Sequence, residues 1–212
     1  MRLDMKRFHL NSLVALAALL PAAAWAQTYT AGPGLALAIP DDGYNGTQGS
    51  MACSTIAVPS GGGGGDTVAT TTVQVAQSHT WSGDLTIKLF SPAGTPITLV
   101  SRPGLVEAAD DGAGCCGTSS DLIIANAITY DDAGSTSAED MGSLGSPIPA
   151  STVSPAPGAA TPGNLGSLNG ESKVGNWLLC LGDSAGGDTG TLDGWTLTLG
   201  TTPVELQNFS ID

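Results

Sequence analysis

The stretch from Gly182 to Gly186 reads GDSAG and raises the question of a catalytic serine. It fits the G-x-S-x-G pattern, in which a nucleophilic serine stands on a sharp turn between a strand and a helix. Such a serine needs a general base that takes its proton. The sequence has two histidines, and only His79 lies outside the N-terminal segment. A hydrolase built on Ser184 would therefore depend on this single imidazole.

The residues that follow Ser184 favour a structural role instead. A nucleophile elbow continues into a helix, whereas residues 186–194 read GGDTGTLDG and cannot sustain one. A chymotrypsin-like enzyme requires two β-barrels and a specificity pocket, and the chain offers too few strands before His79. We therefore predict that residues 182–190 connect two strands and that no residue is catalytic. His79 is interpreted as a hydrogen-bonded core or edge residue.

Carboxylates gather in glycine-containing loops, a pattern suited to a calcium ion. These loops are residues 41–43, 110–112, 131–132 and 183–188. Calcium takes six to eight oxygen ligands, and bent glycine-rich backbone lets several carbonyls converge on one point. The alternative is that the loops are scattered and solvated, since no EF-hand spacing is present. We predict a structural calcium ion held first by Asp183 and Asp188 and next by Asp131 and Asp132.

The N-terminus predicts export. Three basic residues precede an apolar run from Leu13 to Leu20, and the triplet Ala24-Trp25-Ala26 ends the segment. This is the pattern of a signal peptide over residues 1–26, cleaved before Gln27. The apolar run is too short to span a bilayer, and no later segment approaches the required length. We expect a secreted or periplasmic protein with one domain over residues 27–200 and a tail over 201–212.

The charge of the chain argues against nucleic acid as a partner. The formal net charge is −13, and three basic and eighteen acidic residues remain after residue 26, which makes −15. Such a surface repels phosphate backbones. The acidic excess suits the solubility of an exported protein and also supplies oxygen ligands for a divalent cation.

The four cysteines, Cys53, Cys115, Cys116 and Cys180, predict two disulfides in an oxidising compartment. An adjacent pair would need a strained ring to bond to itself. We therefore expect Cys115 and Cys116 each to reach a distant partner, with Cys53 and Cys180 as those partners in either order. A zinc site is disfavoured, because the C-x2-C spacing is missing.

The composition predicts an all-β fold. The sequence has 30 glycines with many Thr, Ser and Val, and it shows no long helical period. Residues 84–90 alternate as a half-buried strand and form a hairpin with residues 96–100. Residues 133–166 show little periodicity. Further strands are expected at 67–75, 122–124, 127–130, 177–181 and 192–199. The tryptophans Trp81, Trp177 and Trp195 are interpreted as core residues rather than as a surface on which a sugar stacks.

Several motifs occur in an order that resembles the P domain, also called the Homo B domain. They are HTWSGDL (79–85), LFSPAGT (89–95), ITYDDA (128–133), LNGE (168–171), GNW (175–177) and GDTGTLDGWTL (187–197). That domain follows the subtilisin-like catalytic domain of kexin, furin and related proprotein convertases. The resemblance covers roughly residues 29–200 and implies a jelly-roll β-sandwich similar to galactose-binding-like domains. It also implies a non-catalytic module that packs against a protease domain, stabilises it and influences its calcium and pH dependence.

These observations lead to one functional hypothesis and two alternatives. Since no subtilisin-like domain precedes the module in this sequence, we expect an exported, stand-alone module that binds or stabilises a separately encoded subtilisin-like protease. The first alternative is a serine endopeptidase component or fragment, or a minimal hydrolase using Ser184 and His79. The second is a carbohydrate-binding or adhesion module. A protease interface would expose an apolar patch, whereas a glycan site would expose aromatic side chains beside polar groups.

Overall fold

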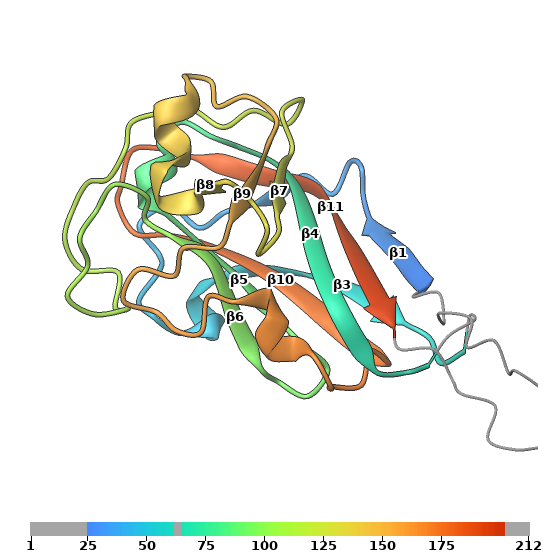
Figure 1. The fold of residues 1–212 in the computed structure, drawn as a ribbon. Coiled ribbons are helices and arrows are strands. Elements are labelled where there is room, and N and C mark those ends of the chain that lie inside the picture. Colours follow the sequence, from blue (N-terminus) through green and yellow to red (C-terminus); the bar gives the residue numbers. More distant parts are fainter. Residues whose placement is uncertain (1–24, 62–64, 202–212) are drawn as a thin grey trace, which may run out of the picture.

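The computed structural model describes residues 25–61 and 65–201, which form two β-sheets of a sandwich (Figure 1). The all-β class predicted from the sequence is confirmed. Most of the predicted signal peptide, and the predicted tail apart from Thr201, lie outside the described residues. No helix in the described part of the chain is long and apolar enough to cross a membrane.

The larger sheet is built around two long antiparallel strands, β4 (Val68–His79) and β11 (Gly190–Thr201). Figure 1 shows them side by side. The strand order is β1-β11-β4-β7-β9-β8, and β2 also pairs with β11. The pairs that β9 makes with β7 and β8 are parallel. The other strands of this sheet are β1 (Trp25–Ala31), β2 (Leu37–Ala38), β7 (Ile128–Tyr130), β8 (Thr136–Ser137) and β9 (Ser151–Ser154).

The smaller sheet is antiparallel throughout, in the order β3-β10-β5-β6. Its strands are β3 (Ala52–Val58), β10 (Gly175–Asp183), β5 (Leu85–Phe90) and β6 (Pro96–Ser101). The hairpin expected from the alternation of residues 84–100 is therefore confirmed as β5 and β6. Asp84 itself precedes the strand, as the last residue of the 3-10 helix η2 (Ser82–Asp84).

The core lies between the two sheets and follows the period-two patterns of the strands. Val73 and Val75 of β4 are fully buried, as are Leu197 and Leu199 of β11. Burying each such side chain contributes about 1.5–3 kcal/mol. Trp177 and Trp195 lie in the same core, as the sequence predicted.

The outer face of β5 is covered as well, which differs from the half-buried strand that we expected. Thr86 and Lys88, which alternate with the core residues of β5, are also buried. The Thr86 hydroxyl contacts the hydroxyl of Ser101 on β6, and Lys88 has its polar partner in the long loop after β6. The ammonium of Lys88 lies 2.5 Å from a carboxylate oxygen of Asp110 in this loop.

Two segments differ from the strand prediction. Residues 122–124 form no strand, because only Leu122 makes a bridge with His79 and the chain then turns from Ile123 to Asn126. Residues 133–166, which showed little periodicity, contain β8 and β9. They also contain the 3-10 helix η3 (Ala138–Leu144) and the start of η4 (Leu165–Leu168), and a further short 3-10 helix, η1 (Gln48–Ser50), precedes β3.

The expected pairing of the cysteines is wrong. Cys53 of β3 and Cys180 of β10 are direct register partners with Cα atoms 4.1 Å apart, and they form a disulfide with each other. Cys115 and Cys116 pair with one another in the loop after β6. No local pattern indicates this strand register, since Cys53 and Cys180 are 127 positions apart in the sequence. The described residues include no free cysteine.

Candidate functional site

A pocket of about 380 Å³ opens where three segments meet at the end of the smaller sheet. The segments are η2 with the residue before it, the loop that carries the vicinal cysteines, and the connection between β10 and β11. A fourth contribution comes from Asp42, after β2. The lining residues are Asp42, Trp81, Asp84, Gly114, Cys115, Cys116, Ser184, Ala185, Gly186 and Asp188.

Ser184 lies in this pocket and makes no hydrogen bond to His79. β10 ends at Asp183 and β11 begins at Gly190, so Ser184 belongs to the connection between the two sheets, as predicted. Its amide donates to the carbonyl of Asp84 at 3.0 Å. Its hydroxyl, on a residue that is 7% exposed, has no hydrogen-bond partner.

The imidazole of His79 is occupied by other groups. Its Nε2 lies 3.1 Å from a carboxylate oxygen of Asp183, and both residues are buried. Its Nδ1 lies 2.9 Å from the carbonyl oxygen of Trp81 and 3.2 Å from the amide nitrogen of the same residue. A Ser–His pair of the kind that activates a nucleophile is therefore not formed between Ser184 and His79.

Asp84 is the most perturbed carboxyl group of the pocket. The residue is 2% exposed and its Oδ1 has no hydrogen-bond partner. Loss of hydration on burial, followed by the negative charges of Asp183 and Asp188, raises the pKa of Asp84 to about 6. His79 and Arg102 act in the opposite direction but do not cancel these effects.

A third polar atom of the pocket residues also lacks a partner. The indole Nε1 of Trp81 is buried and makes no hydrogen bond. Most buried polar groups in proteins are paired, so unpaired atoms on three residues of one pocket call for an explanation. Trp81 offers a donor, Asp84 an acceptor, and Ser184 both. The pocket is thus equipped for a ligand that carries donors and acceptors of its own.

Arg102 binds the backbone of the loop that carries Cys115 and Cys116. Its side chain is buried, and Nη1 donates to the carbonyl of Ala113 at 2.6 Å. Nη2 donates to the carbonyl of Gly114, which lines the pocket. A carboxylate oxygen of Glu107 lies 3.8 Å from Nη1. The guanidinium therefore positions the loop rather than reaching a ligand.

The predicted calcium ligands lie in separate places. Asp188 lines the pocket described above and accepts a hydrogen bond from the Thr80 hydroxyl at 2.7 Å. Asp183 does not line this pocket; it contacts His79 and also accepts from the amide of Ala185 at 3.0 Å. Asp131 and Asp132 line another pocket, of about 350 Å³.

The carboxylates of Asp131 and Asp132 accept hydrogen bonds from other segments of the chain. Asp131 accepts from the Thr72 hydroxyl, and Asp132 accepts from the amides of Leu165 and Gly166 at the start of η4. Within residues 25–61 and 65–201, no three His, Cys, Asp or Glu side chains are grouped so that they could share a metal ion. Calcium at any of these residues stays a prediction.

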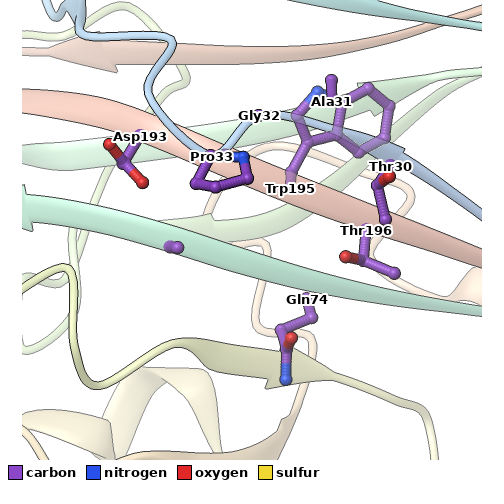
Figure 2. Close-up of a pocket in the computed structure, with 10 residues that line it drawn as sticks. Thr30, Ala31, Gly32, Pro33, Gln74, Asp193, Trp195 and Thr196 are labelled. Carbon is purple, nitrogen blue, oxygen red and sulfur yellow. The ribbon is translucent and has the colours of Figure 1, made fainter.

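A further pocket, of about 250 Å³, lies over β1, β4 and β11 (Figure 2). Trp195 of β11 lies against Ala31, its register partner on β1. The tryptophan is only 2% exposed, and its Nε1 donates to the Ser54 hydroxyl at 3.0 Å. Its ring is therefore a structural element and not an exposed surface on which a sugar could stack.

Comparisons with known proteins include one match to a family model, which covers part of the chain. The family model of the proprotein convertase P-domain matches residues 68–113, which run from β4 to the loop beside the pocket. This match confirms the P-domain resemblance over that segment. No curated protein sequence matches the chain.

Two solved structures are similar to the chain over most of its length. One is the serine protease of Aeromonas sobria, with a TM-score of 0.44, and the other is the complex of that protease (ASP) with the chaperone (ORF2), with a TM-score of 0.45. In each case the identity is 20%, and the match covers 86% of this chain and 28% of the other. This chain thus corresponds to 28% of the length of those proteins.

Proposed function

We propose that this chain is an exported, non-catalytic P-domain module that binds and stabilises a protein partner, and that the partner is a subtilisin-like serine protease. The observation that carries the proposal is the match of residues 68–113 to a domain of proprotein convertases. The occupied imidazole of His79 supports the non-catalytic part, because it leaves Ser184 without a base.

The exposed apolar side chains support a protein partner. Large exposed hydrophobic residues in the described part of the chain are Trp25, Leu35, Val106, Ile123, Ile124 and Leu144. All are aliphatic except Trp25, which precedes the predicted cleavage site. Exposed aliphatic groups are suited to a protein interface, whereas a glycan site needs exposed aromatic rings.

Three of these residues are carried by two loops that are bonded to each other. Ile123 and Ile124 lie in the turn after Leu122, and Leu144 ends η3. The side-chain amide of Asn126 donates to the carbonyl of Ile148 at 2.9 Å, which joins the first loop to the segment after η3. We define Ile123, Ile124 and Leu144 as the aliphatic patch and propose that it contacts the protease.

The proposal is tested by capture from the medium of the secreting cells. The mature chain is immobilised, and bound proteins are labelled with a fluorophosphonate probe that reacts with active serine hydrolases. We expect a labelled protein in the bound fraction, and we expect its thermal inactivation to be slower when the module is present. The double variant Ile123→Asp/Ile124→Asp should lose this protein, whereas the control Val106→Asp should retain it.

Two results would contradict the proposal. One is a bound fraction without any probe-reactive protein. The other is a captured protease whose rate of inactivation is the same with and without the module. Circular dichroism spectra of the variants that match the wild-type spectrum ensure that lost capture reflects the aliphatic patch and not unfolding.

A further inference from the structure

All basic side chains in the described part of the chain are buried and bound to other groups. Lys88 pairs with Asp110, and its ammonium lies 5.4 Å from the centre of the Tyr44 ring. Arg102 donates to the backbone of the loop at Ala113 and Gly114. Lys173 donates to the side-chain carbonyl of Gln27 and to the carbonyl of Gly61. No Lys or Arg therefore lines the pocket that contains Trp81, Asp84 and Ser184.

That pocket carries negative charge from three sides. Asp84 comes from η2, Asp188 from the connection between the sheets, and Asp42 from the segment after β2. The residues that line the pocket include no Lys, Arg or His. The unpaired Oδ1 of Asp84 and the unpaired hydroxyl of Ser184 belong to residues that are more than nine-tenths buried. Both residues line the pocket, and unpaired acceptors of this kind are satisfied by N–H donors.

A metal ion accounts for these features less well than an organic cation. No three carboxylate, imidazole or thiol groups among the described residues are placed to share an ion. The unpaired indole Nε1 of Trp81 is a donor, which a metal cannot accept. A peptide carbonyl oxygen can accept it. An indole ring is also the aromatic surface on which a cationic side chain binds best.

We infer that the pocket of Trp81, Asp84, Ser184 and Asp188 binds the cationic side chain of an arginine or lysine residue in a peptide segment of a partner. The carboxylates and the serine hydroxyl accept hydrogen bonds from the guanidinium or ammonium, and the indole donates to the peptide backbone. This inference rests on the proposed function in that the partner is a protein, and it adds the chemistry by which that partner is recognised.

The test uses the isolated mature chain and small probes, so that it is independent of the protease. N-acetyl-L-arginine amide is titrated at constant ionic strength, and the Trp81 indole signal and the Ser184 amide signal are followed by NMR. The lysine analogue is titrated in the same way. The neutral analogue N-acetyl-L-citrulline amide has nearly the same shape and serves as the matched ligand. Calcium chloride is titrated separately.

We expect saturable shifts of both signals with at least one of the two basic amides, and at least tenfold weaker binding of the citrulline amide. Asp84→Asn and Asp188→Asn should each weaken binding at least fivefold. The control Asp140→Asn removes one negative charge from an exposed position outside the pocket and should bind like the wild type. Spectra of each variant show whether it is folded, and Asp188→Asn changes only a half-buried residue.

Equal binding of the basic and neutral amides would overturn the inference. So would equal affinities in the wild type and both pocket variants, or saturable shifts with calcium but with neither basic amide. If the protease is captured but neither basic amide binds, the inference about the pocket is wrong and the proposed function stands. If a basic amide binds but no protease is captured, the proposed function is wrong and the inference about the pocket stands.

Discussion

His79 and Asp183 join the two sheets through a fully buried contact in which the imidazole Nε2 lies 3.1 Å from a carboxylate oxygen. His79 is the last residue of β4 in the larger sheet, and Asp183 is the last residue of β10 in the smaller sheet. The other carboxylate oxygen accepts from the amide of Ala185. The contact therefore ties together the strand ends that frame the pocket.

Removing one member of this pair should destabilise the fold. Asp183→Ala leaves the imidazole buried without its partner, and we expect the free energy of unfolding to fall by about 2–4 kcal/mol. Urea denaturation at neutral pH measures the change. Asp140→Ala, at an exposed position, should stay within about 0.5 kcal/mol of the wild type. An Asp183→Ala variant with unchanged stability would show that the contact does not hold the sheets together.

The disulfide between Cys53 and Cys180 joins residues that are 127 positions apart in the sequence and should contribute to stability. Replacing both cysteines by alanine is expected to lower the free energy of unfolding by about 2–5 kcal/mol. Peptic digestion without reductant, followed by mass spectrometry, should yield one linked pair of peptides that contains Cys53 and Cys180. Cys115 and Cys116 should appear oxidised within a single peptide. A peptide that links Cys53 to Cys115 or Cys116 would contradict this pairing.

Asp84 should make stability depend on pH. Its pKa is raised to about 6 in the folded state, against 3.8 for an ordinary aspartate, so the folded state binds the proton more tightly than the unfolded state. Burial contributes most to this value, followed by Asp183, His79, Asp188 and Arg102. The contribution of Asp84 is therefore fully present below about pH 4 and is lost as the pH rises through 6.

The variant Asp84→Asn removes the cost of the buried carboxylate. Thermal melts should show the variant to be more stable than the wild type at pH 8, by on the order of 1–3 kcal/mol, and the difference should vanish near pH 4. Asp140→Asn serves again as the control and should show no such trend. The same stability difference at both pH values would refute the role of Asp84.

Ser184 should be inert towards serine-directed reagents. A fluorophosphonate probe is expected to leave the mature chain unlabelled, because the imidazole of His79 already contacts Asp183 and Trp81. Trypsin in a parallel sample confirms that the probe is active. Ser184→Ala should be as stable as the wild type or more stable, since it removes a buried hydroxyl that has no partner. Stoichiometric labelling that disappears in Ser184→Ala would reassign the residue as a nucleophile.

The sequence predicted those parts of the fold whose side chains alternate between core and cover. Val73 and Val75, or Leu197 and Leu199, show this period and lie in the long strands. Residues 122–124 were wrongly predicted as a strand because Ile123 and Ile124 are apolar, yet both are exposed in a turn. The strands β8 and β9 were not predicted from the sequence, because they depend on parallel pairing with distant residues rather than on a local pattern.

The pocket was predictable only in part. Ser184 and Asp188 stood out through a local motif and a run of acidic residues, but their neighbours Trp81 and Asp84 are about a hundred positions away in the sequence. The sole signal for that neighbourhood was the motif HTWSGDL, which contains both residues and belongs to the P-domain resemblance. The calcium prediction grouped carboxylates by composition, and composition carries no sign of the hydrogen bonds that Asp131 and Asp132 accept from Thr72 and Leu165.

The burial of Lys88, Arg102 and Lys173 also bears on how the folded chain resists digestion by trypsin-like enzymes. An enzyme that cleaves after lysine or arginine must draw that side chain into its specificity pocket, and these three are the only such residues after position 26. Lys88 lies within β5, and Arg102 is followed by proline. Residues 25–61 and 65–201 therefore offer trypsin-like enzymes no accessible lysine or arginine, and this part of the chain becomes their substrate only when it opens. When reclosing is faster than cleavage, the rate of tryptic digestion reports the equilibrium population of the open state.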